Sequence, residues 1–181
     1  MRRASVLCVF LLVVLGLWLP AAALPTNPVA ADTVVVIVRH AEKATDDPKD
    51  PSLSAAGQLR AAALAAVLAH APPAHAYATQ FRRTQLTAAP AARAAGAEVQ
   101  VLTASSDPAA DGKRLVEDLL EHWRGRTVLV VGHSNTVPAL VEALSGHAVH
   151  PLTDGDYDRM YIVSIAADGS KRLLATRYGA H

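Results

Sequence analysis

Two histidines and three arginines stand where they could carry out phosphoryl chemistry. Arg39 and His40 follow one apolar run, His133 follows another, and Arg82 and Arg83 stand where a strand is expected to give way to a helix. Guanidinium groups offer paired donors that match phosphate oxygens. A neutral imidazole is a competent nucleophile toward phosphorus. These residue types therefore indicate phosphoryl transfer, provided that the fold brings them together.

The surrounding pattern predicts strands that alternate with helices. Strands are expected over residues 33–38, 76–78, 98–102, 127–131, 159–165 and 171–178, and helices over 54–69, 80–95, 111–123 and 137–144. Ser54 is expected to cap the first helix, and Pro90 to kink the second or stop it early. This order predicts an α/β fold, a three-layer α/β/α sandwich with a mostly parallel central sheet. Ligands of such sheets bind beyond the carboxyl ends of the strands, so His40 and His133 are expected to share one cleft.

Four segments resemble the histidine phosphatase superfamily, also called phosphoglycerate-mutase-like. They cover residues 38–42, 53–58, 79–88 and 131–135, and both their order and their spacing fit. The resemblance extends over residues 33–144 and continues less distinctly to residue 178. It implies a three-layer α/β/α domain that works through a phosphohistidine intermediate, with no metal and no cofactor.

The resemblance implies a role for each matching residue. His40 corresponds to the nucleophile and Arg39 to its phosphate clamp. Arg83 corresponds to the second clamp, because a Ser or Thr precedes that arginine by four positions in the family, as Thr79 does here. His133 corresponds to the second histidine, which binds the phosphoryl oxygens and stabilises their charge. Two arginines beside His40 favour its neutral form, whereas a bound phosphate dianion would favour protonated His133.

The proton donor for the leaving group is not assigned by the resemblance. Neither the glutamate of the mutase-like branch nor the His-Asp pair of the acid-phosphatase branch has a clear match. By position, Glu42, Asp107 and Asp111 are the candidate general acids. A good leaving group, such as a phosphohistidine or a phosphoanhydride, needs less acid assistance. Ala41 also replaces a glycine that is frequent in the mutases.

Two other functions remain open at this level. One is a catalytically weak binder of phosphorylated ligands outside the cytoplasm, although binding alone does not require the nucleophile. The other is an esterase of the α/β-hydrolase type, in which Ser134 is the nucleophile, an Asp between 154 and 158 the orienting group and His181 the base. Thr136 stands where that motif needs its final glycine.

Several other polar residues are interpreted as surface or packing groups. They are Arg82, Gln85, Thr87, the pair His147 and His150, and the three aspartates Asp154, Asp156 and Asp158. Tyr157 and Arg159 are candidates for the rim of the cleft, but the sequence does not place them.

The composition is that of a globular protein without a basic face, and the N-terminus indicates export. Hydrophobic residues make up 51% of the 181 residues, and the net charge of +1 gives no basic face for nucleic acid. Residues 1–23 have the pattern of a signal peptide, 24–32 of a leader, and 33–181 of one phosphatase-like domain. Cys8, the only cysteine, lies in that signal, so thiol chemistry is excluded from the mature chain.

We therefore expect a periplasmic or secreted phosphatase, with an uncleaved N-terminal anchor as the weaker alternative. Its partner is expected to be a small phosphorylated substrate or an envelope phosphate group. No stable membrane span is expected after cleavage, and the sequence assigns neither the natural substrate nor the oligomeric state.

Overall fold

The computed structural model describes residues 31–180. The predicted signal peptide, most of the leader and His181 lie outside this range. Within the described part of the chain, no helix is long and apolar enough to span a membrane.

One six-stranded sheet forms the centre of the domain, with strand order β3-β2-β4-β1-β5-β6. Its strands are β1 (Thr33–Arg39), β2 (His75–Thr79), β3 (Val99–Leu102), β4 (Thr127–Gly132), β5 (Arg159–Ile165) and β6 (Lys171–Arg177). The first four strands of that order pair in parallel, while β5 pairs antiparallel with both β1 and β6. The predicted α/β fold with a mostly parallel sheet is confirmed.

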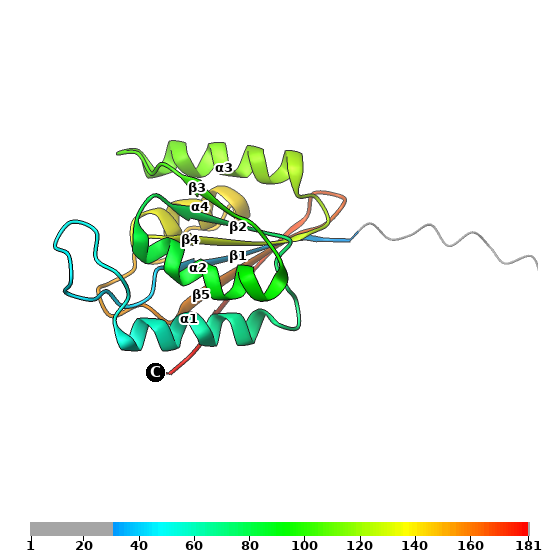
Figure 1. The fold of residues 1–181 in the computed structure, drawn as a ribbon. Helices are drawn as coiled ribbons and strands as arrows, with labels where there is room; N and C mark the ends of the chain where they lie inside the picture. The colour runs from blue at the N-terminus through cyan, green and yellow to red at the C-terminus, as the bar shows by residue number, and fades with distance from the viewer. Residues whose placement is uncertain (1–30, 181) are drawn as a thin grey trace, which may run out of the picture.

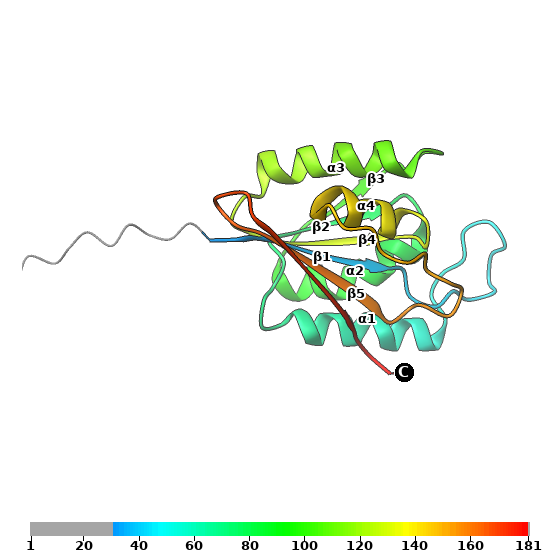
Figure 2. The same cartoon turned by 180° about the vertical axis from the view of Figure 1, so that it is seen from behind.

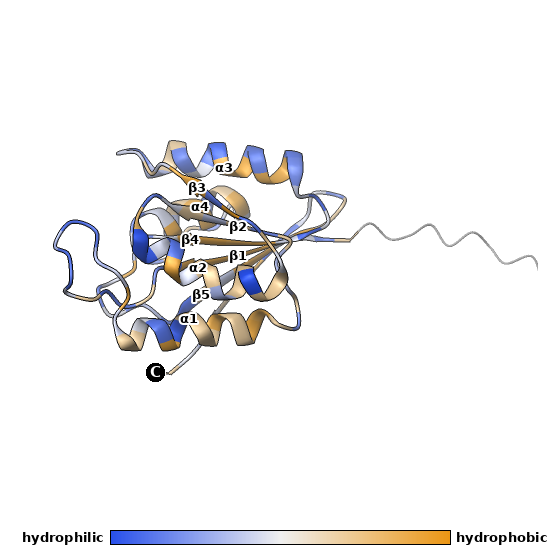
Figure 3. Ribbon diagram, viewed as in Figure 1, coloured by the Kyte–Doolittle hydropathy of each residue, from blue (hydrophilic) through white to orange (hydrophobic). Residues whose placement is uncertain are grey.

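Four helices cover the two faces of the sheet (Figures 1 and 2). α1 (Ala55–Leu68) and α2 (Arg82–Ala95) lie on one face, and α3 (Pro108–His122) and α4 (Thr136–Ser145) on the other. The central strands β1, β2 and β4 are coloured almost uniformly as hydrophobic, whereas hydrophilic and hydrophobic residues alternate along α3 (Figure 3). The result is the predicted three-layer arrangement.

The register of β1 explains why its sequence is an unbroken apolar run. Val35 and Ile37 pack in the core beneath α3 and α4, whereas Val36 and Val38 pack in the core beneath α1 and α2. A parallel strand that is buried on both faces shows no polar alternation. The polar residues Arg39 and His40 follow this apolar run where the strand ends. They therefore lie at the carboxyl edge of the sheet.

The end of α2 matches the predicted position, whereas the start of α3 does not. α2 continues through Pro90 and ends at Gly96, whose left-handed conformation (φ 66°) allows its N–H to bond to carbonyls of the last turn. The predicted end at residue 95 is confirmed, and of the two expectations for Pro90 the early stop is excluded. α3 begins three residues before the expected position 111, because Asp107 caps it and Pro108 fits its first turn. Ser54 caps α1 as expected.

Candidate active site

His40 and His133 lie side by side at the carboxyl edge of the sheet. β1 and β4 are parallel neighbours, and Arg39 is paired in register with Gly132. The residues that follow these two strands therefore emerge next to each other. Their imidazole centroids are 5.4 Å apart, with the rings inclined at 62°. The structure thus brings together the two histidines singled out in the sequence.

His40 is held as a neutral imidazole with one free ring nitrogen. Its side chain is buried, and its Nδ1 lies 2.8 Å from the carbonyl oxygen of Ala41. Because a carbonyl only accepts, Nδ1 carries the hydrogen and Nε2 keeps its lone pair. Burial, and then the positive charges of Arg39, Arg83 and Lys43, lower the pKa of His40 to about 4. Its Nε2 is therefore available as a nucleophile at neutral pH.

Arg39 is anchored by the loop between α4 and β5. Its Nη1 donates to the carbonyl of Thr153 at 2.6 Å, and its Nη2 lies 3.7 Å from the carboxylate of Asp154. The guanidinium carbon lies 4.3 Å from the centroid of the Tyr157 ring. Its Nε is buried and has no hydrogen-bond partner within residues 31–180. This guanidinium is fixed in place while one of its donors is unused.

Arg83 has a matching environment on the other side of the cleft. Its guanidinium carbon lies 4.2 Å from the centroid of Phe81, and its Nη1 lies 3.8 Å from the carboxylate of Asp50. Its Nε is likewise buried without a partner in the described chain. A buried charged donor left unsatisfied is costly. Two such donors from two arginines define a place where an anion with several acceptor oxygens is stabilised.

His133 is supported by two threonine hydroxyls. Its Nε2 lies 2.8 Å from Oγ1 of Thr79, and its backbone N–H donates to Oγ1 of Thr136 at 2.8 Å. Its ring meets the ring of Phe81 edge to face at 5.3 Å. Burial, and then the nearby charge of Arg83, lower the pKa of His133 to about 3. In the unliganded site this histidine is neutral, and an anion beside it would favour its protonation.

Thr87 connects the two halves of the site, which the sequence interpretation missed. Its hydroxyl oxygen accepts from the backbone N–H of Ala41 at 2.9 Å and donates to the carbonyl of Arg83 at 2.7 Å. The side chain is fully buried. Thr87 is thus more than a packing group in α2, because it ties the segment after His40 to the helix that carries Arg83.

Glu42 is engaged away from the two histidines. Its carboxylate accepts three hydrogen bonds from the guanidinium of Arg60, at 2.9 and 3.0 Å from Nε and 2.7 Å from Nη2. Burial raises the pKa of Glu42, but the hydrogen bonds from Arg60 and the backbone outweigh it and hold the pKa below its usual value. An ionised carboxylate in such a pair is a poor proton donor. Arg60 also bonds to the carbonyl of Tyr178, so this pair fastens α1 to the C-terminal segment.

Asp107 and Asp111 are occupied at the start of α3. Asp107 accepts from the backbone N–H groups of Ala109 and Ala110, at 3.1 and 3.0 Å. Asp111 accepts from the backbone and hydroxyl of Ser105 and pairs with Arg114. Neither carboxylate bonds to a histidine or to a clamp arginine within the described residues. The carboxylates that do face the clamps are Asp50 and Asp154, which the sequence did not single out as acids.

The aspartates of the loop after α4 do not form a cation site. Asp156 accepts from Thr153 and from Arg159, and Asp158 is paired with Arg177 at 2.6 Å. Over residues 31–180, no group of three or more His, Cys, Asp or Glu side chains is arranged to hold a metal ion. The hydrogen bonds of Asp156 to Thr153 and Arg159 are those of a local turn. Tyr157, which the sequence could not place, lies at the rim over Arg39.

The turn that carries Ser134 lacks the geometry of a hydrolase elbow. Such an elbow holds its serine on a strained strand-to-helix turn. Here Asn135 is helical (φ −93°, ψ −31°), and none of the described non-glycine residues has a positive φ. The expected base, His181, lies outside the described residues. The backbone therefore disfavours the esterase alternative.

Comparisons with known proteins find a family model that matches part of the sequence and solved structures that share the fold. The model of the histidine phosphatase superfamily (branch 1) matches residues 35–104, which contain Arg39, His40 and Arg83. No curated protein matches the sequence significantly.

Solved structures of phosphatases share the fold. A mycobacterial glucosyl-3-phosphoglycerate phosphatase is 19% identical, with a TM-score of 0.64 over 83% of this chain and 100% of that one. The protein histidine phosphatase SixA with tungstate is 19% identical, with a TM-score of 0.63 over 80% of this chain and 96% of that one. Phosphoserine phosphatase from Entamoeba histolytica is 14% identical, with a TM-score of 0.62 over 82% and 98%. At these identities the likeness concerns the fold. The family model and these structures thus show what the chain is similar to, in sequence over residues 35–104 and in fold over most of its length.

Proposed function

We propose that this protein is a phosphatase that hydrolyses phosphomonoesters through a covalent phosphohistidine on His40. One observation carries the proposal: the buried, neutral His40 lies near enough to Arg39 and Arg83 for their charges to lower its pKa, and both guanidinium groups keep a buried Nε with no partner among residues 31–180. A nucleophile beside an anion site, with a low proton affinity imposed by burial, is the arrangement that phosphoryl transfer requires.

The reaction proceeds in two displacements. Nε2 of His40 attacks phosphorus, the N–P bond forms, and the ester P–O bond breaks with its electron pair on the leaving oxygen, which takes up a proton. Water then attacks the phosphohistidine, the N–P bond breaks with its electron pair returned to Nε2, and inorganic phosphate leaves. The hydrogen bond from Nδ1 to the carbonyl of Ala41 keeps the ring in one orientation through both steps.

The clamps and the second histidine act on the phosphoryl oxygens. Arg39 and Arg83 neutralise the charge of the phosphate, and their aromatic and backbone contacts fix the guanidinium planes beforehand. His133 supports the equatorial oxygens as the transition state forms. Because these groups are ordered before substrate binds, little reorganisation is needed at the moment of reaction.

The substrate class follows from the anion site and from the similar folds. The phosphatase family implies a phosphorylated substrate. The similar solved structures are named as phosphatases of a glucosyl-3-phosphoglycerate, of phosphoserine and of protein histidines, and this supports hydrolysis rather than mutase chemistry. On the N-terminal pattern alone, we also propose that the protein is exported and meets its substrate in the periplasm or outside the cell.

The test is phosphate release from p-nitrophenyl phosphate in excess EDTA, with vanadate as inhibitor. The native protein is expected to hydrolyse the ester without added metal and to be inhibited by vanadate, which resembles the trigonal-bipyramidal transition state. His40→Ala is expected to lose at least about 1000-fold in kcat, since the covalent route is closed. His70→Ala, an exposed histidine after α1, is the matched control and is expected to retain native activity. Equal activity in His40→Ala would overturn the proposal, and anion binding without turnover would favour the binder.

A further inference from the structure

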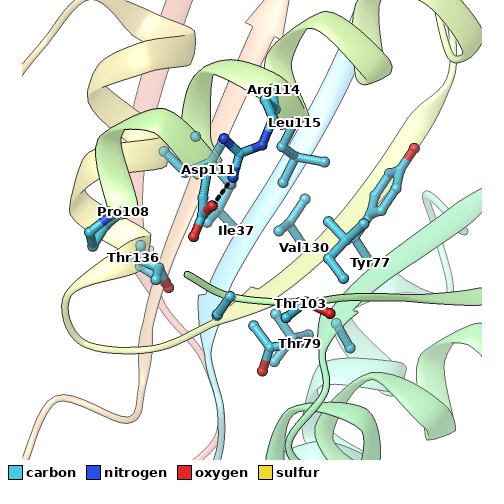
Figure 4. A pocket seen from close by; sticks show the side chains of 18 of the residues that line it. Ile37, Tyr77, Thr79, Thr103, Pro108, Asp111, Arg114, Leu115, Val130 and Thr136 are labelled. Atoms are coloured by element: carbon cyan, nitrogen blue, oxygen red, sulfur yellow. Dashed lines mark hydrogen bonds and ion pairs between the residues drawn. The ribbon is translucent and has the colours of Figure 1, made fainter. Parts of the chain in front are cut away.

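A cavity of about 370 Å³ lies between α3, α4 and the sheet (Figure 4). Dry cavities of about 150 Å³ already bind benzene in proteins. This cavity is more than twice that size and falls in the range of small-molecule sites. It therefore has room for an aromatic ring system or a medium-length alkyl chain.

Apolar side chains make up most of the cavity wall. The sheet contributes Ile37 and Val130, α3 contributes Leu115, and α4 contributes Val137 and Leu140. Native cores are packed at nearly crystalline density, so an apolar space of this size beneath a helix is a departure from ordinary packing. Transfer of a hydrocarbon group from water into it is favourable.

Most of the polar side chains that line the cavity have hydrogen-bond or ion-pair partners. The hydroxyl of Tyr77 donates to Asp118 and accepts from Nε1 of Trp123 at 2.8 Å. At the other end, Asp111 and Arg114 form an ion pair (Figure 4). Because these four charged and aromatic residues already have partners, the wall they leave to an occupant is mainly hydrocarbon.

The cavity shares its wall with the phosphoryl site. Thr79, Gly132 and Thr136 line it. The hydroxyl of Thr79 contacts Nε2 of His133, and the hydroxyl of Thr136 accepts from the His133 backbone N–H. Thr79 and Gly132 are the last residues of β2 and β4, so the cavity reaches the carboxyl edge of the sheet next to His133, which does not itself line it.

We infer that this cavity is the subsite for the alcohol part of the substrate, and that this part is apolar: an aryl group or a medium-length alkyl chain. The inference rests on the proposed function and deepens it. Phosphate bound by Arg39 and Arg83 fixes one end of the substrate, and the hydrocarbon of the ester enters the space beneath α3. Small hydrophilic phosphate esters gain nothing from this space.

A chain-length series tests the inference on the native protein. Ethyl, butyl and hexyl phosphate have leaving groups of nearly equal basicity, so differences in kcat/KM report binding of the chain. A buried methylene improves binding about threefold to fourfold, so hexyl phosphate is expected to exceed ethyl phosphate by roughly 100-fold. Equal kcat/KM across the series, with turnover dependent on His40, would leave the phosphatase standing and overturn the subsite.

A substitution at the mouth of the cavity provides the second arm. Ala104 lines the cavity from the loop after β3, so Ala104→Trp is expected to place an indole in the space while every sheet residue stays as in the native protein. It is expected to lower kcat/KM for hexyl phosphate at least tenfold while ethyl phosphate changes less than threefold. Ala109→Trp, on an exposed position of α3, is the matched control and is expected to behave as native.

Calorimetry separates failure of the subsite from failure of the phosphatase. In His40→Ala, the Kd of hexyl phosphate is expected to be far below that of ethyl phosphate, and the difference to vanish when Ala104→Trp is added. This result would support the subsite even if the native protein hydrolysed neither ester. Equal Kd values for both esters would contradict it whether or not the protein is a phosphatase.

Discussion

The ring of Tyr157 lies over the guanidinium of Arg39, with 4.3 Å between the guanidinium carbon and the ring centroid. The same ring is 6.0 Å from the ring of His40. Across the cleft, Phe81 stands in the same relation to Arg83 at 4.2 Å. Each clamp arginine is thus held against an aromatic face, which fixes its plane in a site that carries concentrated positive charge.

Loss of the Tyr157 ring is expected to weaken phosphate binding. A cation–aromatic contact of this kind is worth about 0.5–2 kcal/mol, so Tyr157→Leu is expected to raise the inhibition constant of inorganic phosphate about 3-fold to 30-fold. Tyr157→Phe keeps the ring and is expected to stay near native. If both variants were equally impaired, the hydroxyl rather than the ring would be the functional group.

The hydroxyl of Thr79 is expected to matter through His133. Thr79→Val removes the oxygen that lies 2.8 Å from Nε2 of that histidine and should lower kcat about tenfold. Thr79→Ser keeps the oxygen and should restore most of the activity. A fall in kcat larger than the rise in KM would mark a role in the transition state. The reverse pattern would show that Thr79 only shapes the ground-state site.

His40 is expected to titrate far below an ordinary histidine. Its pKa of about 4 in the folded protein, set mainly by burial, means that the ring stays neutral throughout the range above pH 5. NMR titration of the ring protons, assigned by loss of the signal in His40→Asn, measures this directly. A midpoint near 6.5 would show that the site is solvated and that the arginines leave the ring unaffected.

The same shift predicts how stability depends on pH. The unfolded chain takes up a proton on this histidine below about pH 6.5, whereas the folded chain resists until about pH 4. As pH falls through this window, the free energy of unfolding therefore decreases because of His40. The decrease is on the order of 2–3 kcal/mol. His40→Asn should show a correspondingly smaller loss between pH 7 and pH 4 in urea titrations. Parallel curves for the two proteins would contradict the buried neutral state.

Glu42 is expected to be structural rather than the general acid. Glu42→Gln breaks the pair with Arg60 and should lower the free energy of unfolding by about 1–3 kcal/mol. Its kcat for p-nitrophenyl phosphate should stay within about threefold of native. A large loss of kcat confined to esters with poor leaving groups would instead return Glu42 to the role of proton donor.

The sequence predicts the parts of this molecule that depend on local pattern. The buried run of β1 and the residues that end it predict both the strand and the position of His40, and parallel pairing with β4 brings His133 beside it. The capping role of Asp107 could have been predicted in the same way, since an Asp before a Pro at a helix start is a capping signal. Its use as a cap, rather than as an acid, follows from α3 beginning earlier than the hydrophobic spacing suggested.

Contacts that join distant segments could not be predicted from the sequence. Tyr157 lies in an irregular loop, and nothing in its neighbours specifies that it folds back onto Arg39. The pairing of Glu42 with Arg60 likewise depends on how α1 packs against the segment after β1. Thr87 could have been suspected, because a hydroxyl four residues after Arg83 can bond to that residue's carbonyl in a helix. Its second contact, with the backbone of Ala41, depends on tertiary packing.

The most direct test of the central claim is to trap the covalent intermediate. Native protein is mixed with a ³²P-labelled phosphomonoester, quenched in denaturant at alkaline pH within the first turnover, and the labelled peptide is sequenced. We predict label on the peptide that contains His40, stable in alkali and released by mild acid, and no label in His40→Ala. Label on any other residue, or phosphate release at the native rate without a labelled protein, would contradict a phosphohistidine on His40.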